Sequence, residues 1–258
     1  MTLRRRLALV ATLALLTLPA PALAQAGASD TWKPAIGRAG DYADGRRGLV
    51  RFATVDERGR LRGQGMRHTA PSASVIKAMF MVAYLRQDSV RDRHLRGRDR
   101  RLLEPMIRES DSVAATRVRD IVGARAIRHL ARRAGMRDFE LHSVWGLSRI
   151  SARDQARFFF EIEDHVPGAH RDYARELLRT IVESQRWGVA QATPPGWTIF
   201  FKGGWAGATG RVNHQAAFLE RGKRRIALAI LTEHSPSHEY GSRTLRGVAK
   251  RLTRRLRD

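Results

Sequence analysis

The sequence predicts an α/β fold of the α+β type, in which a five-stranded antiparallel sheet is flanked by terminal helices and carries an all-helical inserted lobe. Strand patterns occur before residue 70 and again after residue 195, whereas helical patterns dominate the residues between them. At 258 residues, of which 43% are hydrophobic, the chain can bury one core with an inserted lobe. We therefore expect a sheet lobe from residues 30–70 and 195–258, and a helical lobe from residues 71–194.

The first elements are predicted from alternating patterns. Residues 30–46 are expected to form a short helix, which leads into the alternating strand "GLVRFATVD" at residues 48–56. The residues "ERGR" are expected to form a hairpin turn, and "LRGQGM" at residues 61–66 returns as the second strand.

The helical lobe is expected to begin near Ser74 with an apolar helix. It continues in the patterns "LLEPMIRES", "SVAATRVRDIV", "ARAIRHLARRAG", "SARDQARFFFEIED" and "RDYARELLRTIVESQ". Strand patterns then return in "WTIFFKGGW", in "VNHQAAFLE" and, after an "RGKR" turn, in "RIALAILTEH". The last residues, "SRTLRGVAKRLTRRLRD", predict an amphipathic basic helix.

The N-terminus has the layout of a secretory signal peptide. Three arginines precede an apolar run at residues 7–18, and small residues follow at Ala22 and Ala24. The run is too short to span a bilayer. We expect residues 1–24 to be removed, leaving residues 25–258 as an exported, soluble catalytic domain that is periplasmic or secreted. The chain has no cysteine, which excludes disulfides, a thiolate nucleophile and a lipid-modified cysteine.

The formal net charge of +23 favours contact with polyanions. The basic residues are spread through nearly every segment and form no stripe interleaved with aromatic residues, so no specific nucleic-acid site is predicted. Non-specific contact with an anionic wall polymer or a lipid surface is the expected consequence.

Lys77 is an unusual residue in this chain. Most of the 48 basic residues are arginines, and the lysines are only Lys33, Lys77, Lys202, Lys223 and Lys250. Ser74 and Lys77 are three residues apart, which on a helix places both side chains on one face. A serine hydroxyl needs a base to become a nucleophile, and a buried lysine can lose its proton whereas arginine cannot. The Ser-x-x-Lys pattern alone also arises by chance.

Two further segments contain residues that could take part in catalysis. Ser110 and Ser112 precede a helical pattern, where they are either an ordinary N-cap region or, for Ser110, a hydroxyl that relays a proton. Lys202 follows an apolar strand and precedes Gly203 and Gly204, which would let the backbone of a peptide-like substrate approach the strand edge. A bulge or turn with an incidental lysine is the alternative.

In the order Ser-x-x-Lys, Ser-Asp-x, Lys-x-Gly, the chain resembles the penicillin-recognising serine enzymes, most closely the class A β-lactamases and their relatives. The resemblance covers most of the chain after the predicted signal peptide. It implies a β-lactamase- or transpeptidase-like fold and a serine hydrolase that forms an acyl-enzyme. Its substrates would be β-lactams or, as an alternative, D-alanyl-D-alanine peptides of the cell wall.

The resemblance also implies roles for individual residues. Ser74 would be the acylated nucleophile and Lys77 its hydrogen-bonded proton partner. Ser110 would pass a proton to the leaving nitrogen, and Lys202 would hold a positive potential near the substrate carboxylate. The backbone N–H groups of Ser74 and Trp205 would form the oxyanion hole.

The chain departs from the family pattern in its substrate-binding positions. Ser112 replaces the usual asparagine of the second motif, and Gly203 replaces the usual hydroxyl residue before Gly204 in the third. Arg211 could restore part of the lost carboxylate anchoring through a bidentate contact, or it could be another surface arginine.

The largest departure concerns the residue that activates water for deacylation. Class A β-lactamases use a loop glutamate, but the corresponding stretch "FELHSVWGLSRISARD" is short and has Gly146 after Trp145. Glu140 and His142 are nearby in sequence. We therefore expect acylation to be supported and deacylation to be impaired.

A degenerate, non-catalytic module that binds anionic wall polymer is the alternative from another class of protein. The sequence contains no Gly-x-Ser-x-Gly elbow and no His-Glu-x-x-His motif, which argues against a Ser-His-Asp hydrolase and a metallohydrolase. No cofactor and no metal are expected, and a monomer is expected.

Overall fold

The computed structural model describes residues 31–207 and 211–256, so the predicted signal peptide lies outside the described residues. A five-stranded antiparallel sheet has the strand order β2-β1-β7-β6-β5. Its strands are β1 (Leu49–Val55), β2 (Leu61–Gln64), β5 (Thr198–Ala206), β6 (Val212–Arg221) and β7 (Arg224–Glu233). The predicted fold class and the origin of the sheet in both ends of the chain are confirmed.

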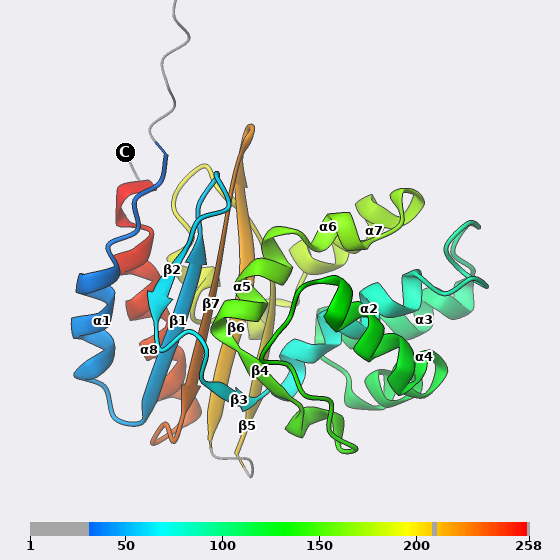
Figure 1. The fold of residues 1–258 in the computed structure, drawn as a ribbon, viewed down its shortest axis with the longest axis horizontal. Coiled ribbons are helices and arrows are strands. Elements are labelled where there is room, and N and C mark those ends of the chain that lie inside the picture. Colours follow the sequence, from blue (N-terminus) through cyan, green and yellow to red (C-terminus); the bar gives the residue numbers. More distant parts are fainter. Residues whose placement is uncertain (1–30, 208–210, 257–258) are drawn as a thin grey trace, which may run out of the picture. The chain divides into compact units, whose positions relative to one another are not determined.

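Both faces of the sheet are covered by helices. On one face α1 (Ile36–Asp44) and α8 (His238–Leu252) contact each other, and on the other face α5 (Ala152–Phe160) packs against β1, β6 and β7 (Figure 1). Strands β6 and β7 are consequently buried along most of their length, and β7 accordingly has a continuous apolar run from Ile226 to Leu231. Helix α5 lies inside the range predicted for the helical lobe, yet the structure packs it on the sheet.

The remaining helices form the part of the chain beside β5. They are α2 (Lys77–Leu85), α3 (Gly97–Glu104), α4 (Ser112–Arg133), α6 (Ile162–His165) and α7 (Arg171–Arg179). Short 3-10 helices span Ala73–Ile76 (η1), Trp145–Leu147 (η3), Gly168–His170, Glu183–Gln185, Ala190–Ala192 and Arg254–Leu256, and a π-helical turn spans Pro105–Glu109. Every residue of α2 is buried, as its uniformly apolar sequence predicts. Helix α4 joins two predicted helical patterns across a break at Gly123, whose φ is 75°.

A second, two-stranded sheet was not predicted. It pairs β3 (Thr69–Pro71) with β4 (Arg149–Ser151) in antiparallel register. Strands of three residues are too short to show an alternating pattern in the sequence. This pairing joins the segment before Ser74 to the segment that follows the loop around Trp145. Among the described residues, no helix is both long enough and apolar enough to cross a membrane.

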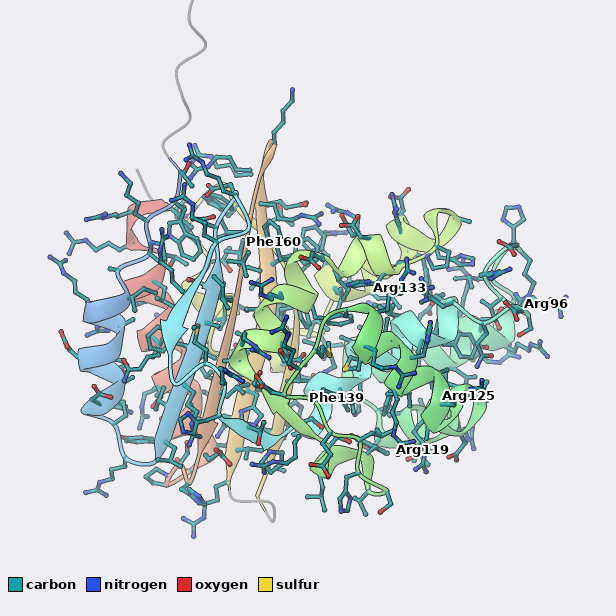
Figure 2. All side chains as sticks on the ribbon, in the orientation of Figure 1. Arg96, Arg119, Arg125, Arg133, Phe139 and Phe160 are labelled. Carbon is teal, nitrogen blue, oxygen red and sulfur yellow. The ribbon has the colours of Figure 1, made fainter. Side chains whose placement is uncertain are left out.

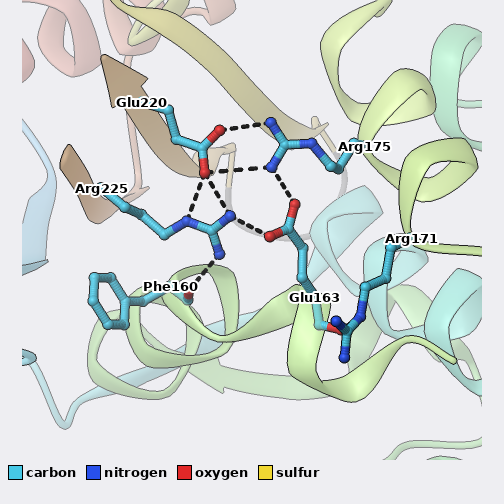
Figure 3. Close-up of polar contacts among 6 residues, drawn as sticks. All are labelled: Phe160, Glu163, Arg171, Arg175, Glu220 and Arg225. Carbon is cyan, nitrogen blue, oxygen red and sulfur yellow. Dashed lines mark hydrogen bonds and ion pairs between the residues drawn. The ribbon is translucent and has the colours of Figure 1, made fainter. Parts of the chain in front are cut away.

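Basic side chains extend from most elements (Figure 2), and some of them are neutralised in a four-membered ion-pair network (Figure 3). Arg175 of α7 and Arg225 of β7 both bind Glu163 of α6 and Glu220 of β6. The Arg175–Glu220 contact measures 2.6 Å. Burial alone would raise the pKa of Glu220, but hydrogen bonds from the two arginines lower it. The network therefore fastens α6 and α7 to the end of the β6–β7 hairpin.

Candidate active site

Ser74 lies in the 3-10 helix η1, directly before α2. Its backbone is fixed on both sides. The Ser72 amide donates a hydrogen bond of 2.7 Å to the carbonyl of Ser148, and Val75 donates to the carbonyl of Ser72. Ala73 has a φ of 43°, a left-handed conformation that non-glycine residues rarely adopt. The half-buried Ser74 is thus presented by a constrained turn, while the helix after it is buried.

Lys77 is the first residue of α2, and its side chain is fully buried. Its ammonium group donates to the backbone carbonyl of Ser110 and lies 3.2 Å from the Ser110 hydroxyl and 3.4 Å from the Ser112 hydroxyl. It also lies 5.1 Å from the centre of the Trp145 ring. Among the described residues no hydrogen bond joins the side chains of Ser74 and Lys77, although the Lys77 amide donates to the Ser74 carbonyl. The ammonium group of the predicted proton partner is directed toward Ser110 in this structure.

Ser110 occupies a strained position between the π-helical turn and α4. Its φ of 59° and ψ of 32° place it in the left-handed region. The following residue, Asp111, caps α4 by accepting a hydrogen bond of 2.5 Å from the Ala114 amide. The N-cap interpretation is therefore correct for Asp111, and the cap holds the Ser110 hydroxyl toward the buried lysines.

Lys202 reaches the same hydroxyl from the sheet. It is fully buried on β5, and its ammonium group lies 3.0 Å from the Ser110 hydroxyl and 2.9 Å from the carbonyl of Gly203. The structure thus brings Lys77, Ser110 and Lys202 together from three segments that are distant in the sequence.

The two lysines have lowered pKa values. Burial lowers the pKa of Lys77 to about 8, although the charge of Asp111 opposes this shift. Burial and then the nearby charge of Lys77 hold the pKa of Lys202 well below its usual value. With a pKa near 8, about a tenth of Lys77 is neutral at pH 7 and can accept a proton. The site therefore supplies a base that works near neutral pH.

Gly204 is required where β5 passes η1. A Cβ atom at this position would lie 2.7 Å from the Ser74 amide nitrogen and 2.8 Å from that of Val75. Gly203 is different, because a Cβ there would meet only side-chain atoms of Trp187 and Gln215, at 3.5 Å or more. The backbone of β5 therefore lies too close to the Ser74 amide to leave room for a side chain at position 204. The next residue is Trp205, whose amide was predicted to contribute to an oxyanion hole.

Trp205 and Arg211 border a cavity of about 260 Å³ beside this strand edge. The Trp205 side chain is 39% exposed and makes edge-to-face contact with Trp187 at 5.8 Å. His238 packs against both rings. Arg211 is exposed, has a φ of 49° and donates to the carbonyl of Pro236. Its predicted role as a carboxylate anchor stays a prediction.

The loop that was predicted to lack a deacylating base has its two titratable candidates on the surface. Glu140 is exposed and pairs through its backbone with Arg149. His142 is exposed, and its Nδ1 accepts a hydrogen bond from the Val144 amide. The side chain that this loop places next to Lys77 is the indole of Trp145, which donates to the Thr116 hydroxyl at 3.1 Å.

Two buried residues of β6 position the site and were not predicted. His214 accepts a hydrogen bond from the Thr232 amide at Nδ1, so its Nε2–H donates to the carbonyl of Pro71 at 2.9 Å. Burial lowers the pKa of His214 to about 4, which keeps the ring neutral. Gln215 binds the Val189 amide and the Trp187 carbonyl through its two side-chain polar atoms. Three consecutive polar residues, Asn213 to Gln215, before the apolar part of the strand were the available signal in the sequence.

No group of three or more metal-ligating side chains lies together in the described parts of the chain. The groups that meet at the site are hydroxyls, amines and backbone carbonyls.

The pattern described as "Beta-lactamase enzyme family" matches residues 94–256, which is more than half of the chain. The chain belongs to the β-lactamase enzyme family. The match includes Ser110 and Lys202 but begins after Ser74 and Lys77. The predicted relationship to the penicillin-recognising enzymes is confirmed at the level of the superfamily, and no curated protein matches the chain.

Solved structures with the same fold include β-lactamases and a penicillin-binding-protein-like structure. A β-lactamase from Sphaerobacter thermophilus is 17% identical with a TM-score of 0.73, covering 85% of this chain and 96% of its own. The structure titled PBP-A is 17% identical with a TM-score of 0.72, covering 87% and 97%. A class A β-lactamase from Mycobacterium abscessus is 17% identical with a TM-score of 0.73, covering 86% and 98%. At these identities the similarity establishes the fold alone.

Proposed function

We propose that this member of the β-lactamase enzyme family is a serine acyl-transfer enzyme that forms a covalent acyl-enzyme at Ser74. The observation that carries the proposal is the meeting of two buried lysines on one hydroxyl, that of Ser110, beside the constrained turn that presents Ser74. A site that only bound a ligand would gain nothing from two lysines whose pKa values are lowered by burial.

Acylation would proceed by attack of the Ser74 hydroxyl oxygen on the carbonyl carbon of an amide or β-lactam. The neutral amine of Lys77 takes the hydroxyl proton as the new C–O bond forms. The C–N bond then breaks, and the Ser110 hydroxyl gives its proton to the leaving nitrogen and regains one from Lys77. Because Lys77 is hydrogen-bonded to Ser110 in this structure, the return of the proton follows an existing contact.

The charge on the developing oxyanion would be met by the backbone amides of Ser74 and Trp205. The close approach of Gly204 to the Ser74 amide supports this role. Preorganised donors of this kind typically account for about 3–4 kcal/mol of barrier each. Lys202 would meet the substrate carboxylate, with Arg211, Ser112 and the Gly203 backbone completing the binding surface.

Deacylation is proposed to be slow. The loop beside Lys77 contributes Trp145, whereas Glu140 and His142 are exposed. Within the described residues, no carboxylate side chain is hydrogen-bonded to Lys77, Ser110 or Lys202. An acyl-enzyme without a base for water would persist, as in an enzyme that binds penicillin and acts on D-alanyl-D-alanine peptides. That activity is the second candidate function.

We further propose that residues 1–24 direct the chain out of the cytoplasm, where wall peptides and β-lactams are available. Its strongly positive charge would then favour contact with anionic wall polymer or lipid.

The proposal is tested by comparing Lys77→Arg with the wild type. The exchange keeps the positive charge but removes the ability to lose a proton, so we expect labelling by a fluorescent penicillin to fall by at least 100-fold. Drug hydrolysis and D-alanine release from a D-alanyl-D-alanine peptide, followed on the wild type, separate the two candidate functions. Labelling of Lys77→Arg at the wild-type rate contradicts the proposed base. Salt-sensitive polymer binding without any labelling would favour the non-catalytic module.

A further inference from the structure

A groove of about 530 Å³ lies at the end of α2 that is farther from Lys77, against the second half of α4. Nine residues separate Lys77 from Arg86, which along a helix corresponds to about 14 Å. The groove is thus distinct from the Ser74 site. Its polar wall is formed by Arg86, Arg91, Arg125, His129 and Arg132, above apolar side chains of the two helices.

Most of these cations are not neutralised. In residues 31–207 and 211–256, no carboxylate lies within ion-pair distance of Arg86, Arg125 or Arg132, whereas Arg91 pairs with Asp88 and Asp92. Burial lowers the pKa of Arg86, and the nearby charges of Arg133 and Arg91 lower it further. The positive charges here repel one another, in contrast to the paired arginines of the network in Figure 3.

The position of these residues is not explained by helix stability alone. Arg132 and Arg133 lie in the last turn of α4, where cations interact favourably with the helix dipole. Arg86 is the C-cap of α2 and has the same explanation. Arg125, by contrast, lies two residues after the break at Gly123, far from the C-terminal end of α4. Figure 2 shows Arg125 and Arg133 on the α4 side of the molecule.

We propose that this groove binds a phosphate-bearing anion with two or more phosphate groups. The guanidinium group recognises phosphate oxygens through paired hydrogen bonds, which favours phosphate over a single carboxylate as the ligand chemistry. Arg86 is already oriented, because its Nη1 donates to the carbonyl of His165 at 3.0 Å. The volume falls within the range of small-ligand sites. A bound polyanion would remove the repulsion that now lowers the pKa of Arg86.

Binding of sodium tripolyphosphate, measured by isothermal titration calorimetry at 0.15 M NaCl, tests this proposal. The variant Arg125→Gln/Arg132→Gln removes two exposed groove cations. The matched control, Arg58→Gln/Arg60→Gln, removes two exposed arginines from the β1–β2 turn with the same change in net charge. We expect the groove variant to bind at least 10-fold more weakly and the control to change by less than 2-fold, roughly as lost charge-assisted hydrogen bonds imply.

The variant Arg125→Lys/Arg132→Lys keeps both positive charges but removes the planar guanidinium groups, so it tests the geometry of the contacts apart from their charge. It also replaces the glutamine variant in the test if that variant is poorly folded. We expect it to bind more weakly than the wild type, because lysine lacks the fork geometry. Binding that is weakened in the groove variant but not in the control is groove-dependent. Groove-dependent binding of tripolyphosphate without binding of phosphatidylglycerol vesicles identifies a soluble phosphate chain as the ligand class. Groove-dependent binding of both tripolyphosphate and the vesicles identifies a lipid headgroup. Absence of tripolyphosphate binding, or equal weakening in the control variant, overturns the proposal.

Discussion

The exchange Gly204→Ala should disable the site while the neighbouring Gly203→Ala leaves it working. At Gly204 the added Cβ would lie 2.7 Å from the Ser74 nitrogen, 2.8 Å from the Val75 nitrogen and 3.1 Å from the Ser72 oxygen. All three are backbone atoms, which cannot turn away as a flexible side chain does. At Gly203 the nearest atoms belong to the side chains of Trp187 and Gln215 at 3.5–3.6 Å, an ordinary contact distance.

The expected loss can be worked out from these distances. Restoring an ordinary contact of 3.4 Å from 2.7 Å requires a shift of about 0.7 Å between β5 and η1. A misplacement of about 1 Å in catalytic geometry can reduce a rate by about 100-fold, and loss of one oxyanion donor has an effect of about 100- to 1,000-fold. We therefore expect Gly204→Ala to acylate at least 100-fold more slowly. The overpacking should also lower the free energy of unfolding by about 1–3 kcal/mol.

The assay is the rate of covalent labelling by a fluorescent penicillin, measured for both variants together with thermal unfolding. Gly203→Ala is expected to retain labelling within about 3-fold of the wild type and to unfold at a similar temperature, since its added Cβ meets no atom closer than an ordinary contact. Equal labelling by Gly204→Ala and the wild type would refute the inferred packing of β5 against the Ser74 amide. An equal loss in both variants would refute the distinction between the two glycines.

Three further predictions concern protonation. The acylation rate should rise as the pH is raised through about 8, because Lys77 must be neutral to act as the base, and a flat stopped-flow profile between pH 6 and 10 contradicts this. A carboxylate-bearing ligand should raise the pKa of Lys202, which burial and the charge of Lys77 lower, so binding should be accompanied by proton uptake as the pH is raised from 6 to 10. Calorimetry in two buffers with different ionisation enthalpies measures this uptake, and identical binding enthalpies at every pH argue against it. The pKa of Glu220 is lowered in the folded protein, so its stabilising effect is present above the usual carboxyl pKa and is lost as the pH falls through the folded-state pKa. At pH 7, Glu220→Gln should therefore have a free energy of unfolding about 1–3 kcal/mol below that of the wild type. In acid the difference between the two proteins should be smaller. Denaturant titrations of both proteins at pH 7 and in acid measure this difference. The same difference in unfolding free energy at both pH values would contradict the pairing of Glu220 with Arg175 and Arg225.

The sheet could be predicted because its strands are long enough to carry a pattern. Strands β6 and β7 have ten residues each, and a two-residue turn at Gly222 joins them in register from Arg221 and Arg224. The pairing of β3 with β4 could not be predicted, because three residues at each strand give no periodic signal.

Part of the candidate site was also accessible from the sequence. The three motifs predicted that Lys77, Ser110 and Lys202 would matter, and the structure places them together. The spacing of Ser74 and Lys77 predicted that both side chains share one face, and the family resemblance implied a hydrogen bond between them. In the structure the Lys77 ammonium group instead contacts Ser110, which is 33 residues away. Such a choice between acceptors depends on tertiary packing that no local spacing records.

The supporting residues and the cationic groove depend still more on tertiary structure. His214 stabilises the segment before Ser74 through the Pro71 carbonyl, a contact between residues 143 positions apart. The spread of basic residues along the chain predicted only diffuse contact with polyanions, whereas packing α2 against α4 gathers Arg86, Arg125 and Arg132 around one groove.

Covalent acylation of Ser74 is tested most directly by intact-protein mass spectrometry after mixing with a penicillin. We expect the wild type to gain the mass of one intact drug molecule and to keep it for many minutes, while Ser74→Ala gains nothing. A transient adduct with accumulating hydrolysed drug would still identify the nucleophile but would contradict slow deacylation. An adduct on Ser74→Ala, or none on the wild type, would contradict acylation of Ser74.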